Sequence, residues 1–293
     1  MMLKKVVVCG VGLIGGSFAL ALKAAGAVGE VVGLGRTQAS LAAAQQRGVI
    51  DRIASGWADA LEDADLVFLA MPVGQMLPVM QALAPHLPLA TIVTDGGSTK
   101  RDVVTAARAA FGEKIAQFVP GHPIAGAEKS GVEAAQADLF QGKRVVLTPL
   151  AENSAAQVAC VQRAWEACGA QVSQLDAAAH DQVFAAVSHL PHLLAFALVH
   201  EFAERADADQ LFGFAAGGFR DFTRIASSHP EMWRDICLAN RHALLGELDA
   251  YMAELMRTRG LLAGADAQGL QAMFDTARTR RDAWLESLLP VGE

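Results

Sequence analysis

Cysteine is scarce in this sequence, and basic residues do not cluster anywhere along it. The four cysteines have neither CxxC spacing nor the density of a disulfide scaffold, which predicts reduced thiols in a cytosolic protein. The formal net charge is −7, so neither nucleic acid nor an anionic membrane surface is expected as a partner. A small anionic ligand would instead need locally placed arginines.

Charged residues are also few. They make up 19% of the chain against 53% for hydrophobic residues, which excludes a disordered chain and suits a large buried core. At 293 residues the chain is long enough for about two domains.

Two apolar segments imitate targeting or membrane sequences. Residues 1–27 place two lysines before an apolar stretch, but glycines interrupt that stretch from Gly10 onward. Residues 183–200 lack formal charge, yet they contain Pro191 and three histidines, a load that lipid rarely accepts. The sequence therefore predicts a soluble, cytoplasmic protein.

Short apolar runs alternate with helical patterns in the first half of the chain. Continuous apolar runs are typical of a parallel sheet covered on both faces, and their alternation with helices predicts an α/β, doubly wound sheet. The predicted strands are residues 6–9, 31–34, 66–70, 91–94, 116–119, 145–148 and 172–175, and the predicted helices include 16–25, 38–47, 76–84 and 100–111.

The pattern changes after about residue 176. No clear strand follows, and helical periodicity extends over residues 177–205, 231–259 and 267–289. The second half is therefore predicted to be an all-α domain that begins with a long helix.

Three glycines, Gly10, Gly12 and Gly15, form a GxGxxG segment between the first predicted strand and the first predicted helix. In dinucleotide-binding folds the first glycine permits a tight turn, the second lets the backbone approach a pyrophosphate, and the third lets the helix pack closely. Leu13 and Ile14 open the helix, whose free N–H groups and dipole hold phosphates. The alternative is merely a tight strand–helix turn. The position predicts a Rossmann-type domain over residues 1–175, followed by a helical domain over 176–293.

The end of the second predicted strand indicates which dinucleotide is bound. NAD-binding sites usually place a carboxylate there, about 20 residues after the glycines, to bind the ribose 2′-hydroxyl. Gly35 occupies that position, and Arg36, followed by Thr37, could pair with a 2′-phosphate. NADP is therefore predicted, with NAD left possible. The alternative is that Arg36 is simply a solvated surface residue.

Two loops after predicted strands carry polar side chains. Ser98 lies after the fourth strand, at the edge where α/β sheets bind ligands, and capping of the next helix is the alternative role. His122 follows the fifth strand, among glycines and a proline that could hold it toward a substrate. A solvent-exposed turn histidine is the alternative.

The helical half contains a second group of polar residues. His189 and His192 are three positions apart, but without a cysteine or HExxH-type arrangement no metal is expected. Arg220 and Arg224 share a helix face if their segment is helical, and an ion pair of Asp221 with Arg224 is the simplest interpretation.

These segments together resemble a known family. The blocks GVGLIGGS at 10–17, GHPIAG at 121–126, SHLPH at 188–192 and FRDFTR at 219–224, with Trp233, are similar to the prephenate/arogenate (cyclohexadienyl) dehydrogenases of tyrosine biosynthesis. The second and third blocks are much more specific than the glycine loop. The similarity extends from about residue 6 to residue 240, and the last fifty or so residues carry no matching motif. The family combines a Rossmann domain with a helical dimerisation domain, which implies a homodimer.

The resemblance also implies roles for single residues. His122 matches the catalytic histidine that hydrogen-bonds the ring C4 hydroxyl, and Ser98 matches a serine that orients that histidine or the hydroxyl. His192 and Arg224 match residues that hold the substrate, the arginine through a carboxylate. Supporting pocket positions are Gly217, Asp221 and Trp233, and Glu128 matches a position that contacts the substrate side chain or closes the site.

The reaction expected from this resemblance is the NADP-dependent oxidative decarboxylation of prephenate or arogenate. Two other classes are weighed against it. A β-hydroxyacid dehydrogenase or imine reductase typically uses a lysine in the long helix, and residues 177–205 contain none. A non-catalytic dinucleotide sensor would not need the combination of His122, His192 and Arg224.

Overall fold

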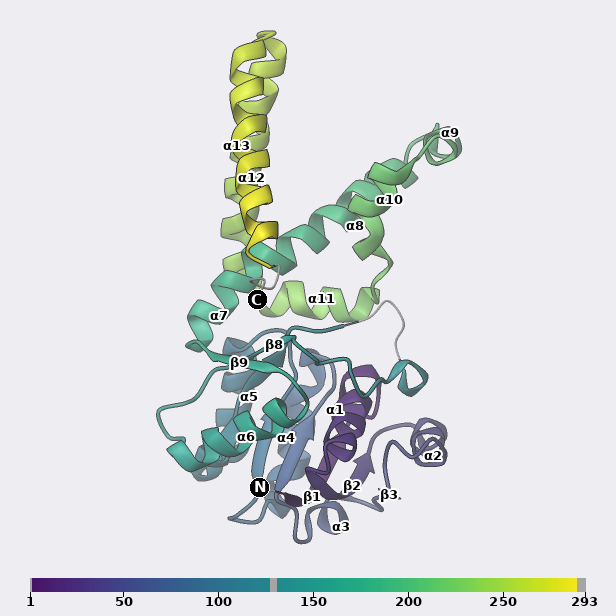
Figure 1. Ribbon diagram of the computed structural model, residues 1–293, viewed down its shortest axis with the longest axis vertical. Helices are drawn as coiled ribbons and strands as arrows, with labels where there is room; N and C mark the ends of the chain where they lie inside the picture. Colours follow the sequence, from purple (N-terminus) through teal and green to yellow (C-terminus); the bar gives the residue numbers. More distant parts are fainter. Residues whose placement is uncertain (1, 127–130, 289–293) are drawn as a thin grey trace. The chain divides into compact units, whose positions relative to one another are not determined.

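The computed structural model describes residues 2–126 and 131–288, and it divides into two compact units, Met1–Leu244 and Leu245–Glu293. The first unit contains two β-sheets and the helices as far as α11, and the second contains two long helices (Figure 1).

The main sheet of the first unit has six parallel strands in the order β3-β2-β1-β4-β5-β6. This is the strand order of a Rossmann fold, in which ligands bind at the carboxyl ends of the strands. The strands are β1 (Leu3–Cys9), β2 (Val28–Leu34), β3 (Arg52–Ile53), β4 (Leu66–Leu69), β5 (Ile92–Asp95) and β6 (Phe118–Val119). The predicted α/β fold with a helical C-terminal part is confirmed.

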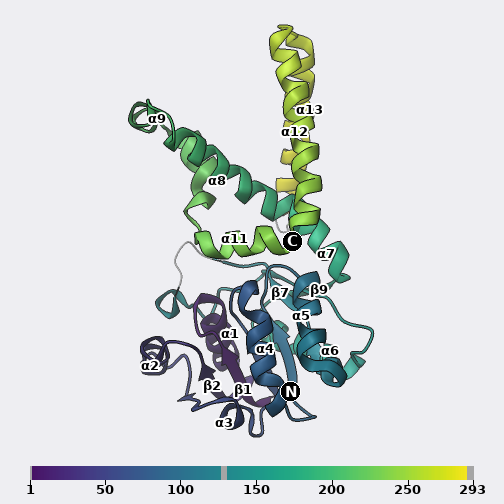
Figure 2. The ribbon, with the colours of Figure 1, turned by 180° about the vertical axis from the view of Figure 1, so that it is seen from behind.

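Helices cover both faces of this sheet, because its central strands are apolar on both sides (Figures 1 and 2). On one face Phe18 packs between Phe68 and Trp165, with ring centroids 4.6 Å from each. That face is covered by α1 (Leu13–Ala24), α2 (Gln38–Gln46) and α6 (Ala155–Ala167), and the other by α3 (Trp57–Leu61), α4 (Met76–Leu83) and α5 (Arg101–Phe111).

A second, three-stranded sheet corrects the prediction of a single sheet. β7 (Gly121–Pro123) pairs antiparallel with β8 (Arg144–Leu147), which pairs parallel with β9 (Gln171–Gln174). β8 and β9 correspond to the last two predicted strands, but neither joins the main sheet. β3 and β7 were not predicted, because one has two residues and the other contains glycine and proline, which strands disfavour.

The long helix predicted over residues 177–205 is interrupted. α7 (Ala177–Phe184) and α8 (Leu190–Ala203) are joined by a π-helical turn, Ala185–His189. Pro191 lacks an N–H group and would clash with the carbonyl four residues earlier in a regular helix, so the wider turn just before it relieves both problems. By length and composition alone, Ala177–Ala203 is one run in the described chain that could span a membrane.

The helix predicted over residues 231–259 is also two helices, α11 (Pro230–Ala239) and α12 (Arg241–Ala263). α11 ends with Asn240 as its C-terminal cap. The side-chain amide of Asn240 donates to the Asp181 carbonyl, 2.7 Å away. Between α8 and α11 lie α9 (Ala208–Gly213), α10 (Gly217–Thr223) and a 3-10 helix (Arg224–Ser227).

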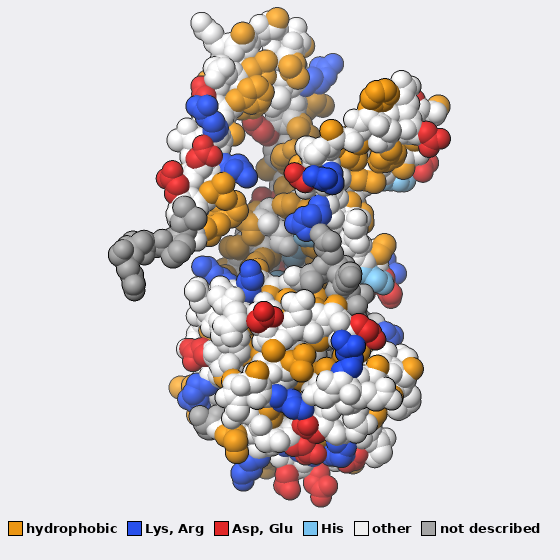
Figure 3. Space-filling view, turned by 45° about the vertical axis from the view of Figure 1, so that its right-hand side comes forward, with side chains coloured by type: hydrophobic (Ala, Val, Ile, Leu, Met, Phe, Trp, Pro, Cys, Tyr) orange, Lys and Arg blue, Asp and Glu red, His pale blue; other side chains and the backbone are white. Residues whose placement is uncertain are grey.

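The second unit is a helical hairpin in which α12 continues and α13 (Ala267–Glu286) follows. Ala265, with φ +50°, reverses the chain, and Asp266 caps α13 by accepting from the Gly269 N–H. None of the α13 side chains is buried. On the face drawn in Figure 3, hydrophobic side chains gather over the helical segments of both units.

Candidate functional site

The glycine loop between β1 and α1 has the geometry that a dinucleotide pyrophosphate requires. Gly10 has φ +95°, and a Cβ there would lie 2.4 Å from the Ala70 carbonyl oxygen. A Cβ on Gly15 would lie 2.2 Å from the Gly10 oxygen, so the helix can pack this closely only without a side chain. Gly12 faces open space, with no atom within 4 Å of its Cβ position. The tight turn at Gly10 and the close helix packing at Gly15 are therefore present, Gly12 leaves room beside the loop, and the loop fits a bound pyrophosphate.

The first turn of α1 adds a favourable electrostatic environment. It contains Leu13 and Ile14, both half-buried, and it has no acidic residue. Its backbone N–H groups lack helical carbonyl partners, so they and the positive end of the helix dipole remain for an anion.

The end of β2 is exposed. Gly35, Arg36 and Thr37 all lie at the surface between β2 and α2, and the Thr37 side chain does not cap α2. Within the described part of the chain, the Arg36 guanidinium makes no hydrogen bond or ion pair. It is therefore available to a ligand that reaches this edge of the sheet.

His122 lies in β7, not in a loop at a strand tip as the sequence suggested. Its Cα pairs with that of Val146 in β8, so backbone hydrogen bonding fixes the residue more firmly than a turn would. The prediction of a loop was wrong because Gly121 and Pro123 are typical turn residues. Here they form a short edge strand, where the missing N–H of proline is tolerated.

A buried ion pair holds the backbone beside His122. Lys100 and Asp95 are both 0% exposed, and their side chains contact each other directly. Asp95 also accepts from the Gly121 N–H at 3.0 Å, and Lys100 donates to the Gly121 carbonyl at 2.6 Å. The loop after β5 and the start of β7 are therefore tied together through Gly121.

The His122 imidazole contacts residues of α7. Its Nδ1 lies 2.9 Å from Nε2 of His180, and the ring centroid of Phe184 is 5.0 Å away. Burial lowers the pKa of His122 well below its usual value, and the nearby His180, Lys100 and His189 lower it further. A neutral imidazole at neutral pH follows.

Asp181 is the centre of a hydrogen-bond network behind His122. Its Oδ1 lies 2.8 Å from Nδ1 of His180, and its two carboxylate oxygens accept from the backbone N–H groups of Lys100 and Arg101 at 2.8 and 2.9 Å. Burial raises the pKa of Asp181, but the hydrogen bonds from His180 and the two backbone groups outweigh it, and the net pKa lies below the usual value. Asp181 is therefore a buried carboxylate.

The same network reaches His189 through Asn240. The Asn240 Nδ2 group donates to the Asp181 carbonyl and lies 3.1 Å from Nδ1 of His189. Burial lowers the pKa of His189 to about 4, although Asp181 and the Ser98 carbonyl act to raise it. Its Nε2 is buried without a hydrogen-bond partner among the described residues.

A second cluster brings three of the predicted residues together. The rings of His192 and Trp233 stack with centroids 3.7 Å apart and planes inclined by 17°. Nδ1 of His192 donates to the Ser188 carbonyl at 2.8 Å. Burial lowers the pKa of His192, the hydrogen bond to the Ser188 carbonyl acts to raise it, and the positive charge of Arg224 lowers it.

The remaining predicted residues are less closely grouped. Ser98 is half-buried in the loop after β5, with its carbonyl facing His189. Gly217 and Asp221 lie exposed on α10, where Asp221 pairs with Arg220 at 3.5 Å. Glu128 lies outside the described residues.

The comparisons with known proteins identify the family. Residues 18–174 match the nucleotide-binding domain of prephenate dehydrogenase, and residues 176–276 match the dimerization domain of prephenate dehydrogenase. The chain belongs to the prephenate dehydrogenase family. It is therefore an oxidoreductase by family membership.

Relatives of the prephenate dehydrogenase family match over nearly the whole chain. A prephenate dehydrogenase of Bacillus subtilis is 37% identical over 94% of this chain and 75% of its own length. A cyclohexadienyl dehydrogenase of Zymomonas mobilis is 36% identical over 95% of each chain.

Solved structures of the family agree with the fold. Prephenate dehydrogenase from A. aeolicus, in complex with hydroxyphenyl propionate and NAD+, aligns with a TM-score of 0.89 at 35% identity, covering 97% of this chain and 99% of that one. Synechocystis arogenate dehydrogenase aligns with a TM-score of 0.81 at 30% identity, covering 96% and 99%. These family relationships support a nicotinamide dinucleotide as the cofactor, which the glycine loop fits.

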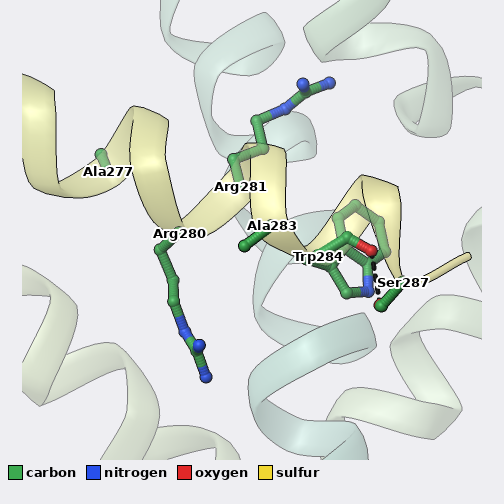
Figure 4. Close-up of a pocket in the computed structure, with 6 residues that line it drawn as sticks. All are labelled: Ala277, Arg280, Arg281, Ala283, Trp284 and Ser287. Atoms are coloured by element: carbon green, nitrogen blue, oxygen red, sulfur yellow. Dashed lines mark hydrogen bonds between the residues drawn. The ribbon is translucent and has the colours of Figure 1, made fainter.

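A hollow on the surface of the second unit contains none of the predicted site residues. It is lined by five residues of α13 and by Ser287, which follows the helix, with Arg280 and Arg281 pointing away from the helix axis (Figure 4). Because α13 and the residue after it supply the whole lining and no predicted site residue contributes, this hollow is part of the helix surface and not an active site. Its lining residues are Ala277, Arg280, Arg281, Ala283, Trp284 and Ser287.

Proposed function

We propose that this protein catalyses the oxidative decarboxylation of prephenate, arogenate or both, with NADP as the hydride acceptor. The organic products are 4-hydroxyphenylpyruvate from prephenate and tyrosine from arogenate. The observation that carries the proposal is His122, a neutral imidazole fixed in β7 next to the carboxyl end of β5. The carboxyl ends of Rossmann strands are where cofactor and substrate meet, and family membership supports the same reaction.

In this proposal His122 accepts the proton of the ring C4 hydroxyl while hydride leaves C4 for the nicotinamide. The C4–H and O–H bonds break, and a C4 carbonyl forms. Loss of the ring carboxylate as carbon dioxide then sends an electron pair through the ring to the C4 oxygen. His122 returns its proton to that oxygen, so the imidazole is neutral again at the end of the cycle.

The helical residues bind the substrate in this proposal. Arg224 pairs with a substrate carboxylate, and the stacked rings of His192 and Trp233 form an adjoining wall. Ser98 orients the hydroxyl or His122, and Glu128 contacts the substrate side chain or closes the site. Gly217 and Asp221 are proposed as supporting positions of the pocket.

NADP is favoured over NAD by the end of β2. Gly35 leaves no carboxylate to bind the 2′-hydroxyl, and the exposed Arg36 guanidinium could pair with a 2′-phosphate, with Thr37 beside it. The NAD+ complex of the A. aeolicus relative keeps NAD as the competing cofactor.

We further propose a division into an NADP-binding domain, residues 1–175, and a helical domain for substrate binding and dimerisation, residues 176–293. A second copy of the chain would cover the exposed apolar side chains of the helical domain, which supports a homodimer. The apolar run Ala177–Ala203 carries Asp181, which accepts from the backbone at the start of α5, and His180, which contacts His122 of β7, and these buried polar contacts support a soluble, cytoplasmic protein.

The test is a steady-state assay of the purified protein with prephenate and arogenate, each offered with NADP and with NAD. Formation of reduced nicotinamide in any of the four combinations supports the reaction, and the largest kcat/KM identifies the preferred substrate and cofactor. Absence of turnover in all four, with NADP still bound, would refute the proposed reaction while leaving the dinucleotide-binding domain in place.

A further inference from the structure

Behind His122 lies a chain of hydrogen bonds to which the proposed function assigns no role. It runs from Nδ1 of His122 to Nε2 of His180 and from Nδ1 of His180 to Oδ1 of Asp181. His180 is 0% exposed and Asp181 2% exposed, so water does not compete for these contacts. We propose that His180 and Asp181 are positioning residues that fix the tautomer of His122 and keep its Nε2 unprotonated toward the substrate. This inference rests on the proposed function, because it concerns His122 as the proton acceptor.

The tautomers follow step by step from the carboxylate. An ionised carboxylate can only accept hydrogen bonds, so Nδ1 of His180 must carry a proton. A neutral imidazole has a single N–H, which leaves Nε2 of His180 as an acceptor. Nδ1 of His122 must then be the donor in the bond between the two rings. The remaining ring nitrogen of His122, Nε2, carries a lone pair and is free to take a proton.

The surroundings of His180 keep its imidazole neutral. Burial lowers the pKa of His180, which keeps the ring neutral although Asp181 acts to raise that pKa. The other charged groups near the pair are Lys100, which disfavours a second positive charge, and Asp95, which is neutralised by its contact with Lys100. The neutral His180 tautomer is therefore the favoured state.

Asp181 is itself held in place by the first turn of α5. The backbone N–H groups of Lys100 and Arg101 donate to its two oxygens, so the carboxylate cannot rotate without losing one of them. The N-terminal end of a helix also stabilises a negative charge. The chain of hydrogen bonds thus begins on the same segment that carries Lys100, whose side chain holds Gly121 next to His122.

The arrangement also favours the charge that forms during the reaction. When Nε2 of His122 takes the hydroxyl proton, the imidazolium donates more strongly through Nδ1 to His180. His180 in turn donates to the Asp181 carboxylate, whose negative charge stabilises the positive one across the intervening ring. Asp181 stays ionised throughout, and no proton needs to leave the chain of hydrogen bonds.

Two substitutions at one position separate this role from simple packing. In His180→Gln the amide oxygen can accept from His122 and the amide nitrogen can donate to Asp181, so the direction of the hydrogen bonds is kept. In His180→Phe the ring volume is kept and both hydrogen bonds are lost. His200→Phe, at an exposed position in the last turn of α8, is the matched control.

We expect His180→Phe to lower kcat by roughly 10- to 100-fold, with KM for the substrate changed less than about threefold, because an incorrect tautomer impairs proton transfer more than binding. His180→Gln should recover at least about tenfold of this loss, and His200→Phe should match the wild type. The dissociation constant for NADP should be the same in all four proteins, which checks that each is folded. Equal kcat values for His180→Phe and His200→Phe would overturn the inference.

A spectroscopic measurement tests the tautomer without relying on turnover. In 15N NMR spectra of the labelled wild type, with the His122 signal identified by its loss in His122→Asn, Nδ1 should be protonated and Nε2 unprotonated at neutral pH. An Nε2–H tautomer would refute the inference even if the enzyme is active. A wild type without turnover but with the expected tautomer would instead count against the proposed reaction.

Discussion

The sheet-containing part of the chain and the helical part differ in how they bury their apolar side chains. Before residue 177, the large hydrophobic residues that are exposed in the described chain are Met2, Leu77 and Leu89. From residue 177 onward the exposed ones are far more numerous, and α9, α10 and α13 bury no residue at all. They are Val183, Val187, Phe212, Phe214, Phe222, Leu238, Leu245, Met252, Leu255, Met256, Leu262, Phe274, Trp284, Leu285 and Leu288. The sheet completes its core within one chain, whereas the helices leave many apolar side chains exposed, as the proposed homodimer would require.

The sheet-containing part and the helical part also supply different residues to the proposed site. The sheet side supplies the cofactor loop and His122, which are fixed by buried strands and the Lys100–Asp95 pair. The helical side supplies His192, Trp233 and Arg224, of which the arginine is exposed. We therefore expect changes on the sheet side to affect turnover and changes on the helical side to affect substrate binding or assembly.

The largest effect is expected from His122→Asn. Loss of the proton acceptor should reduce kcat by about 100-fold or more, the usual contribution of a general acid–base group, with NADP affinity unchanged. Stopped-flow or steady-state nicotinamide absorbance gives kcat, and fluorescence titration gives the NADP dissociation constant. Near-normal turnover would remove His122 from the mechanism.

The next effect concerns stability and pH, through His189. Its pKa is lowered from 6.5 to about 4 by burial, with His180 and His192 also lowering it and Asp181 and the Ser98 carbonyl raising it. In the unfolded chain His189 binds a proton below about pH 6.5, whereas in the folded chain it binds one only below about pH 4. Folding stability should therefore fall as the pH is lowered across this window, by up to about 3 kcal/mol from this group.

Urea unfolding of the wild type and of His189→Gln at pH 7 and pH 4.5 measures this contribution. The variant should lose less stability between the two pH values than the wild type does, whatever its stability at pH 7. Equal losses in both proteins would contradict a neutral, buried His189.

Arg224→Ala should mainly raise KM, by roughly 10- to 100-fold, because a hydrogen bond to a charged group typically contributes about 1.5 to 3 kcal/mol. kcat at saturating substrate should change much less, since the arginine binds the substrate and does not move a proton. Initial rates over a wide substrate range separate the two parameters. An unchanged KM would give Arg224 a structural role instead.

Exchange of Gly35→Asp together with Arg36→Asn should shift the ratio of kcat/KM for NADP over NAD toward NAD by roughly tenfold or more. The carboxylate would bind the 2′-hydroxyl and repel a 2′-phosphate, and the lost guanidinium would no longer pair with it. Both cofactors are titrated at fixed substrate in the wild type and the variant. An unaltered ratio would show that this edge does not select the cofactor.

The smallest expected change tests the comparison between the two parts directly. Met256→Glu places a charge on a side chain of α12 that is 69% exposed, and Leu89→Glu does the same on the sheet side, where Leu89 is 86% exposed. A charge buried in an interface between copies should weaken the dimer by roughly tenfold, whereas Leu89→Glu should leave it unchanged. Sedimentation equilibrium measures both. Identical association in the two variants would contradict the proposed interface.

The sequence was sufficient for the fold and for the parts of the site that repeat a local pattern. The glycine loop and the strands of the main sheet other than the two-residue β3 depend on spacing and hydrophobicity along the chain, which a single sequence displays. β7 and the separate second sheet could not be predicted in this way, because pairing of three residues with a distant strand is a property of the folded chain.

Several residues around His122 were missed for the same reason. Asp95, Lys100, His180, Asp181 and Asn240 meet only after α5, α7 and α11 pack together. One signal was available. Asp181 is a charged residue within an otherwise apolar helical stretch, and such residues are seldom buried unless a partner holds them.

The π-helical turn has a consequence for the angular positions of the histidines. His180 and His192 are twelve positions apart, and at roughly 100° per residue a regular α-helix would separate them by about 120° around its axis. The wide turn at Ala185–His189 absorbs one additional residue, which reduces that separation to about 20°. The extra residue in the turn thus brings the two histidines to nearly the same side of the helical run, where His180 contacts His122 and His192 stacks on Trp233.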